Sequence, residues 1–229
     1  MTKALSGLLL APLALAAASS TAVFLYGALS HVDATLFLLL GAAAYPAFHK
    51  ALSKTGYAYV AAHECSHALA ALLSGVKIKK ISVGRRGGYV LLDAGNAFIT
   101  LAPYFVPFYA VAAALSYFLA GFFINIAPAR PYFLALSGFL ISFHALSTAE
   151  ILAGPVQSDI KKAGGRAFSY SAILALNSLA ASIMVKLLFP ELFSFGAYLK
   201  DIYLRAGAIF VFLGKAAIYC FNTAKIYMN

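Results

Sequence analysis

Residues 61–75 read AAHECSHALAALLSG and set an H-E-x-x-H pattern inside an apolar run. Residues 58–74 contain no glycine or proline and are rich in alanine and leucine, so a helix is expected here. In a helix, His63 and His67 lie one turn apart on the same face, where two imidazoles can share one Zn²⁺. Glu64 is one step around the helix and can act on a metal-bound water without being a ligand. The stretch therefore predicts a metal-binding helix that carries a general base.

The composition identifies a membrane protein. Of the 229 residues, 63% are hydrophobic and 10% are charged, whereas soluble domains have about 25% charged residues. The chain has five His and seven acidic residues, and two of the His and one Glu fall within five consecutive positions. An ionisable side chain at bilayer depth costs on the order of 2.5–3.5 kcal/mol on insertion scales, so this cluster is a candidate functional site. A purely structural role in bonding helices together is the alternative.

We expect an all-α polytopic membrane protein with about six to seven transmembrane helices, because the apolar segments are long enough to cross about 30 Å of hydrocarbon. Tyr45-Pro46 can kink or break the second segment. The expected domains are N-terminal transmembrane segments in 1–54, a core in 55–190 and a C-terminal segment in 191–229. The apolar segments lie at about 4–29, 34–49, 55–75, 97–122, 131–153, 168–189 and 203–222.

Basic residues gather in the short connections. The net charge is +10, but the clusters at 77–86 and 161–166 lie between apolar segments, as the positive-inside effect predicts for cytoplasmic loops. The bilayer is therefore the expected partner, and nucleic acid is not. With the motif helix leading into the first of these clusters, we expect the motif toward the cytoplasmic side. Cys65 and Cys220 make no disulfide framework, and Cys65 is expected to be a small packing residue.

A β-hairpin is predicted between the third and fourth segments. Residues 76–83 alternate in part, 84–88 supply turn residues, and 89–92 return with β-favouring side chains. An edge strand here could take an extended peptide by strand addition. Alternatively, the basic strand presses on anionic lipid.

Further polar residues and prolines interrupt the later segments. Pro103 and Pro107 lie inside one would-be span, where a kink could open the wall of a cavity. The fifth segment has a polar side near its end, formed by His144, Ser147, Thr148 and Glu150. Asp159 stands at the entry to the next helical region, where it could bend toward the motif or act only as a helix cap. Asn177 could bridge two helices or help to position a substrate.

With these parts, the chain resembles the site-2 protease class of intramembrane zinc metalloproteases, peptidase M50, and within it a divergent M50B-like branch. The residues that carry the resemblance are 63–67, the run 75–84 into the hairpin, and Asp159, which follows His67 by 92 positions. The resemblance implies Zn²⁺ bound by His63, His67 and Asp159, with Glu64 as the catalytic base. The family commonly has Asp-Gly where this chain has Asp159-Ile160, and it has one span between motif and Asp where two segments are drawn here. His144 and Glu150 therefore stay open as alternative third ligands, and one of the two segments is expected to be a broken or partial crossing.

The resemblance implies a zinc metalloendopeptidase that hydrolyses peptide bonds in or near transmembrane segments of membrane-protein substrates. Two other functions are compatible with the residues. One is a non-proteolytic metal-binding membrane protein, such as a transporter or a scaffold. The other is an adaptor that recruits a partner through the basic hairpin. The sequence indicates no oligomeric state.

Overall fold

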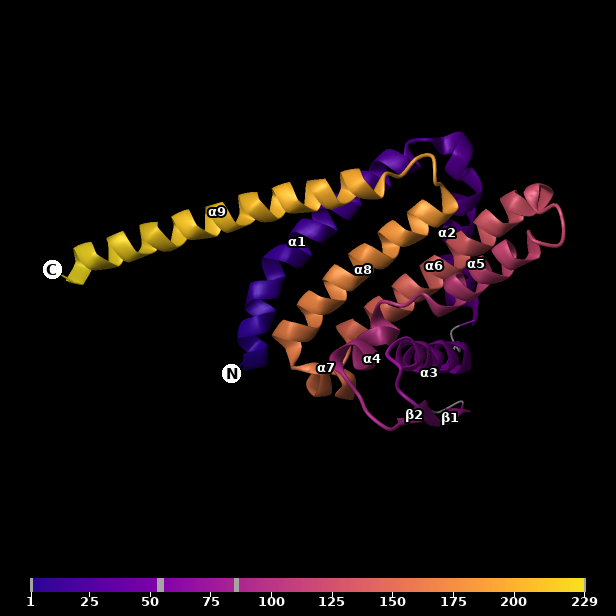
Figure 1. The fold of residues 1–229 in the computed structure, drawn as a ribbon, viewed down its shortest axis with the longest axis horizontal. Coiled ribbons are helices and arrows are strands. Elements are labelled where there is room, and N and C mark those ends of the chain that lie inside the picture. The colour runs from indigo at the N-terminus through magenta and orange to yellow at the C-terminus, as the bar shows by residue number, and fades with distance from the viewer. Residues whose placement is uncertain (1, 53–55, 85–86, 229) are drawn as a thin grey trace.

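The fold is a bundle of long helices with a small β-hairpin at one end (Figure 1). The computed structural model describes residues 2–52, 56–84 and 87–228. The long helices are α1 (Thr2–Leu29), α2 (Val32–Leu52), α3 (Gly56–Leu73), α5 (Phe108–Ala120), α6 (Arg130–Ala153), α8 (Arg166–Leu188) and α9 (Phe195–Met228). The short elements are β1 (Ile78–Gly84), β2 (Gly87–Leu92), α4 (Ala97–Leu101), η1 (Ala102–Tyr104), η2 (Ala127–Ala129) and α7 (Ser158–Ala163).

The described chain contains five helices that are long and apolar enough to cross a membrane, namely α1, α2, α6, α8 and α9. A sixth span is possible if the bent pair formed by residues 97–104 and α5 is counted as one. This confirms the expected all-α multi-pass membrane protein with a hairpin after the motif helix. α2 continues through Pro46 without ending, so the second segment is an unbroken helix.

Close backbone contacts hold two helix pairs together, α1 with α8 and α2 with α6. At the α2–α6 crossing, a Cβ atom added to Gly41 would lie 1.8 Å from the carbonyl oxygen of Ala135, and one added to Gly138 would lie 2.0 Å from that of Leu38. Only glycine allows this approach. Small residues at helix crossings are how membrane helices gain van der Waals contact without a hydrophobic driving force between them.

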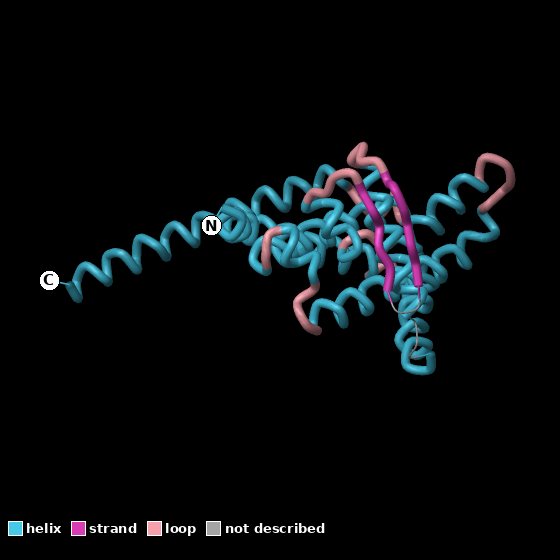
Figure 2. The backbone as a smooth tube through the Cα atoms, turned by 90° about the horizontal axis from the view of Figure 1, so that it is seen from below, coloured by secondary structure: helices cyan, strands magenta, loops and turns pink. Residues whose placement is uncertain are grey.

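The motif helix α3 lies at the end of the bundle together with the hairpin, α4 and α7 (Figure 1). Figure 2 shows the hairpin lying across the same end when the molecule is seen from below. α3 is not among the helices that are apolar enough to span, although the sequence-based count treated 55–75 as a span. The reason is in its composition, because His63, Glu64 and His67 lower the hydropathy of an 18-residue helix.

Because α3 lies at the end of the bundle and is not apolar enough to span, the connections that carry the basic residues lie at one end of the molecule. The Nζ atom of Lys3 donates to the carbonyl oxygen of Ala163, at 3.2 Å, so the N-terminal end of α1 lies beside α7. The lysines of β1 and of α7 are at this same end. A count of seven spans would have placed Lys3 on the side of the membrane opposite to the other basic clusters. The contact of Lys3 with Ala163 removes this disagreement.

The hairpin has the predicted position. β1 pairs antiparallel with β2, with Ser82 opposite Tyr89 and an irregularity between Ile78 and Lys80. Arg85 and Arg86, which belong to the predicted turn, lie outside the described residues. Within the described chain the sheet has two strands, so each strand keeps one edge without a strand partner.

The two prolines of the fourth segment mark a break. α4 and α5 meet at 86° around residues 105–107, and Pro107 occupies the N-cap of α5. α4 itself begins at Asn96, whose side chain accepts from the backbone N–H of Ile99 at 2.8 Å. The expected broken crossing between the motif and Asp159 is this bent pair, and the bend brings α4 and η1 against α3.

Candidate metal centre

Three side chains from two elements converge beside the hairpin. His63 and His67 come from α3, and Asp159 comes from the first turn of α7. The Nε2 atom of His63 lies 3.4 Å from Oδ2 of Asp159, and that of His67 lies 3.9 Å from the same oxygen. All three ligand atoms are within 4.8 Å of one another. The described residues contain one such group, and it could hold a metal ion.

The donor set fits zinc. Tetrahedral Zn²⁺ binds His nitrogen and carboxylate oxygen at about 2.0–2.2 Å, which places neighbouring ligand atoms about 3.3–3.6 Å apart. The 3.4 Å and 3.9 Å separations from Asp159 are close to that spacing, and all three ligand atoms lie within 4.8 Å of one another. The three side chains are between 14% and 17% exposed, which leaves them reachable from one side.

Neighbouring groups orient the three side chains. The Nδ1 atom of His67 donates to the carbonyl oxygen of Ile99 at 2.8 Å, and this leaves the Nε2 lone pair directed toward Asp159. The hydroxyl of Tyr104 donates to Oδ2 of Asp159 at 3.2 Å, and the hydroxyl of Tyr59 lies 3.4 Å from Nδ1 of His63. Such outer contacts fix the tautomer and the ring orientation of metal-ligating histidines.

The electrostatics keep Asp159 ionised. Burial raises the pKa of its carboxyl group, but the interactions with His63 and His67 and the hydrogen bond from Tyr104 lower it, and the net shift is downward. A carboxylate that is ionised at neutral pH is the form that binds a metal ion.

Glu64 shares a cavity with the three convergent side chains. The cavity has a volume of about 360 Å³. It is lined on one side by His63, Glu64 and His67 of α3, and on another by four residues of β2, namely Gly88, Tyr89, Val90 and Leu92. Glu64 is 7% exposed, and its Cγ atom lies against Gly88 of the hairpin. The base candidate and the hairpin therefore face the same space.

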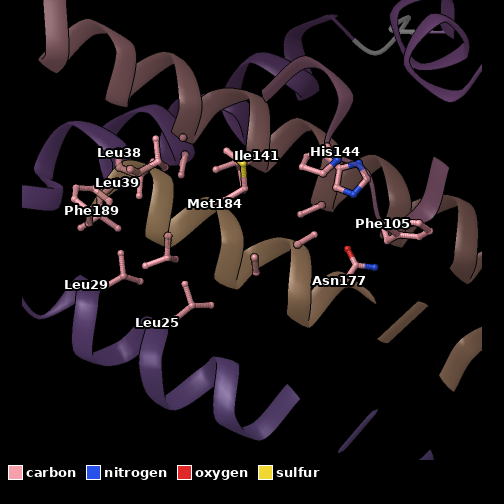
Figure 3. Close-up of a pocket in the computed structure, with 18 residues that line it drawn as sticks. Leu25, Leu29, Leu38, Leu39, Phe105, Ile141, His144, Asn177, Met184 and Phe189 are labelled. Carbon is pink, nitrogen blue, oxygen red and sulfur yellow. The ribbon is translucent and has the colours of Figure 1, made fainter. Parts of the chain in front are cut away.

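The other two candidate ligands lie elsewhere. His144 lines a separate apolar cavity of about 350 Å³ between α1, α2, α6 and α8, shown in Figure 3. Its buried Nε2 atom has no hydrogen-bond partner in the part of the chain that the structure describes. Glu150 pairs with His49, with 3.0 Å between Oε1 and Nε2. Neither side chain belongs to the group around His63 and His67.

A comparison with known families gives a match over more than half of the chain. The family model described as Peptidase M50B-like matches residues 34–154. The chain belongs to the Peptidase M50B-like family. Searches of curated proteins and of solved structures return no match. The matched stretch of this M50B-like protein contains His63, Glu64, His67 and the hairpin, and it ends before Asp159. The place of Asp159 therefore depends on the geometry and not on the family match.

Sequence reasoning missed the aromatic contacts of this M50B-like centre. Tyr104 was part of a segment interpreted only as a proline kink, yet its hydroxyl contacts Asp159 and its ring lies edge-on to that of His63, with 5.8 Å between the centroids. The available signal was a tyrosine between two prolines in an apolar segment. Tyr59, one helical turn before His63, was a second signal.

Proposed function

We propose that this M50B-like protein is an intramembrane zinc metalloprotease that hydrolyses peptide bonds in or near transmembrane segments of membrane-protein substrates. The observation that carries the proposal is the convergence of two His, one Asp and one Glu on a single cavity at the end of a membrane-helix bundle. The family is one of membrane metalloproteases.

The chain's own residues supply the remaining chemistry. His63 and His67, through Nε2, and Asp159, through its carboxylate, would hold the ion. A zinc ion with three protein ligands lowers the pKa of water to about 7 and polarises a carbonyl group. The carboxylate of Glu64 takes a proton from the attacking water and gives it to the leaving nitrogen as the C–N bond breaks. The products are a carboxylate and an amine.

The hairpin is suited to hold an extended substrate. A peptide bond in a transmembrane helix is shielded and internally hydrogen-bonded, so the substrate has to unwind before cleavage. β2 lines the cavity and has one edge without a strand partner among the described residues, so its backbone groups can pair with an unwound peptide. The lysines of β1 are exposed, although Lys79 pairs with Asp93 and Lys80 lies over the ring of Tyr89, and exposed cations at this face are compatible with contact to anionic lipid as well as with strand addition.

We also propose that the centre faces the cytoplasm. Lys3 contacts Ala163, and the lysines of β1 and of α7 lie at the same end of the molecule as the convergent side chains. Positive residues concentrate in cytoplasmic connections. The cut in a substrate is therefore expected near the cytoplasmic end of its span.

The proposal predicts metal-dependent cleavage of a single-span substrate. The purified protein is reconstituted into liposomes with a substrate of known orientation that carries a Gly-Pro pair near its cytoplasmic end. We expect cleavage there, loss of cleavage when a chelator removes the metal, and recovery when Zn²⁺ is restored. Mass spectrometry of the products locates the cut. The matched control is the same span with Leu-Leu in place of Gly-Pro, which should be cleaved more slowly because it stays helical.

Two results would contradict the proposal. A preparation that binds stoichiometric zinc but cleaves no span in a panel of such substrates points to a non-proteolytic metal-binding protein. A preparation that binds no zinc when its helical content and thermal unfolding are normal rules out the metal centre. A cut at the opposite end of the substrate would reverse the proposed orientation.

Gly88 supplies a prediction about the hairpin. A Cβ atom at Gly88 would lie 2.6 Å from both Cγ of Glu64 and the carbonyl oxygen of Ser82, so Gly88→Ala has to displace the base or the strand. We expect cleavage to fall on the order of 10- to 100-fold with zinc content unchanged, because small misplacements of reacting groups have effects of this size. Gly95→Ala is the control, since Gly95 lines the same cavity and a Cβ atom there meets nothing within 4 Å. Equal rates for the two variants would contradict this role of Gly88.

A further inference from the structure

One short segment contacts all three proposed ligands. Within α4 and η1, the carbonyl oxygen of Ile99 accepts from His67, the hydroxyl of Tyr104 donates to Asp159, and the ring of Tyr104 lies against that of His63. We propose that Tyr104 is the positioning residue that sets the carboxylate of Asp159 against the two histidines, and that Asn177 of α8 anchors it. The proposal deepens the proposed function and depends on it.

Asp159 needs such a restraint because it lies on a short helix between two loops. It lies on a helix of six residues that follows the loop after α6 and ends at Gly164, whose φ is 156°. The hydroxyl of Ser158 reaches the other carboxylate oxygen only at 3.5 Å and is exposed. In the described structure, the hydrogen bond from Tyr104 is therefore the one that ties this carboxylate to an element outside α7 and the histidines.

Tyr104 is itself held firmly. Its side chain is buried, with 1% of the residue exposed. Tyr104 is the last residue of the 3₁₀ helix η1, where the N–H of Phe105 donates to the carbonyl oxygen of Ala102 at 3.2 Å. The Nδ2 atom of Asn177 donates to the carbonyl oxygen of Tyr104 at 2.8 Å and to that of Ile173 in its own helix at 3.0 Å. The backbone of Tyr104 is thus tied to α8 while its hydroxyl reaches α7.

Figure 3 shows how Asn177 is placed for this task. Its side chain lies at the end of the apolar cavity where Phe105 and His144 also lie, away from Leu25 and Leu29. Apart from His144, which lies close enough to interact with the Asn177 side chain, the remaining lining is aliphatic or aromatic, and Asn177 donates to the backbone carbonyls of Tyr104 and Ile173. An amide buried in such surroundings forms hydrogen bonds or costs free energy, which fixes its orientation.

The expected consequence is a loss of metal affinity. Tyr104→Phe keeps the ring against His63 and removes only the hydroxyl that holds Asp159. Outer partners of metal ligands are typically worth about 10- to 100-fold in affinity or activity, so zinc affinity measured by chelator competition should fall within that range. The rate constant kcat should fall more than KM rises, because the substrate surface is unchanged.

The experiment compares Tyr104→Phe with Tyr109→Phe. Tyr109 also has a partly buried hydroxyl, but it donates to the carbonyl oxygen of Ala58 on α3 at 2.9 Å and touches none of the three ligands. Both purified variants are loaded with Co²⁺ in detergent, and the visible absorption spectrum reports the ligand geometry. We expect a changed spectrum and weaker zinc binding for Tyr104→Phe, and the wild-type values for Tyr109→Phe.

A second pair tests the anchor from another helix. Asn177→Leu has nearly the same volume but cannot donate to Tyr104, whereas Ser178→Ala removes a hydroxyl that bonds only within α8, to Leu174 at 2.8 Å. Asn177→Leu should shift the Co²⁺ spectrum in the same direction as Tyr104→Phe, and Ser178→Ala should not.

Wild-type spectra and affinities for both Tyr104→Phe and Asn177→Leu would overturn the proposal while leaving the metal centre intact. A wild-type protein that binds neither Zn²⁺ nor Co²⁺ would instead overturn the proposed function. If Tyr104→Phe does not fold, Asn177→Leu decides alone. A folded Asn177→Leu with the wild-type spectrum then counts against the proposal.

Discussion

Glu64→Gln is expected to lower the rate of peptide cleavage by about 10²- to 10⁴-fold while zinc stays bound, which is the range that a positioned acid–base group contributes. Gln keeps the size and helical position of Glu64 but cannot take a proton from the attacking water. Glu64 is not in the group of three convergent ligand atoms, so its replacement leaves those ligands in place. The measurement is cleavage of the single-span substrate together with zinc content by elemental analysis.

The control for this change is Cys65→Ala, the next residue of the same helix. Cys65 is half-buried, is a free thiol and lines no part of the metal cavity, so the variant should cleave at the wild-type rate. Undiminished cleavage by Glu64→Gln would exclude the proposed mechanism. Glu64→Gln also distinguishes the protease from the rival function. A transporter or scaffold that only holds zinc has no need of a base beside it, so its function should survive this change.

Most of the helices could be predicted because each is a local feature of the sequence. The apolar runs predicted the helix positions. For example, the expected segment 131–153 corresponds to α6 (Arg130–Ala153), and the expected segment 97–122 corresponds to the bent pair that begins at Ala97. The turn residues around 84–88 gave the hairpin. Alternation, apolar length and helix-breaking residues act within a few positions of one another, so they can be read without knowing the fold.

The arrangement at the end of the bundle could not be predicted in the same way. α3 has the length of a span, and only its packing with the hairpin, α4 and η1 places it at one end of the molecule. The contact of Tyr104 with Asp159 joins residues 55 positions apart. His144 had the right chemistry for a ligand, but it faces an apolar cavity formed by helices far apart in the sequence. Contacts of this kind depend on tertiary packing and have no local signature.

The structure also bears on the residue that follows the expected third ligand, Asp159. From the sequence, Asp159 departs from the family pattern because Ile160 follows it in place of glycine. In the structure Ile160 is 1% exposed and belongs to the main apolar core with Ile99 and Leu101. With Ile160 buried in this core, the neighbouring Asp159 lies beside His63 and His67 of α3. Ile160 thus packs into the core at the position where the family commonly has glycine, while Asp159 contacts His63 and Tyr104.

Asp159→Asn is expected to weaken zinc binding by more than about 100-fold and to abolish cleavage at ordinary zinc concentrations, since loss of even an outer partner costs about 10- to 100-fold. Asn keeps the shape of the side chain and an oxygen that can accept from Tyr104, but it lacks the negative charge that draws the cation between His63 and His67. Zinc content after gel filtration with a weak chelator, and thermal unfolding with and without Zn²⁺, measure the effect.

His144→Ala is the matched comparison, because it removes the ligand that the sequence alone left open. His144 faces the apolar cavity and is not in the group around Asp159, so this variant should keep its zinc and its zinc-dependent rise in unfolding temperature. The opposite pattern, with zinc lost from His144→Ala and kept by Asp159→Asn, would move the third ligand to α6. It would also require α6 to turn toward α3, because His144 and the two motif histidines line different cavities.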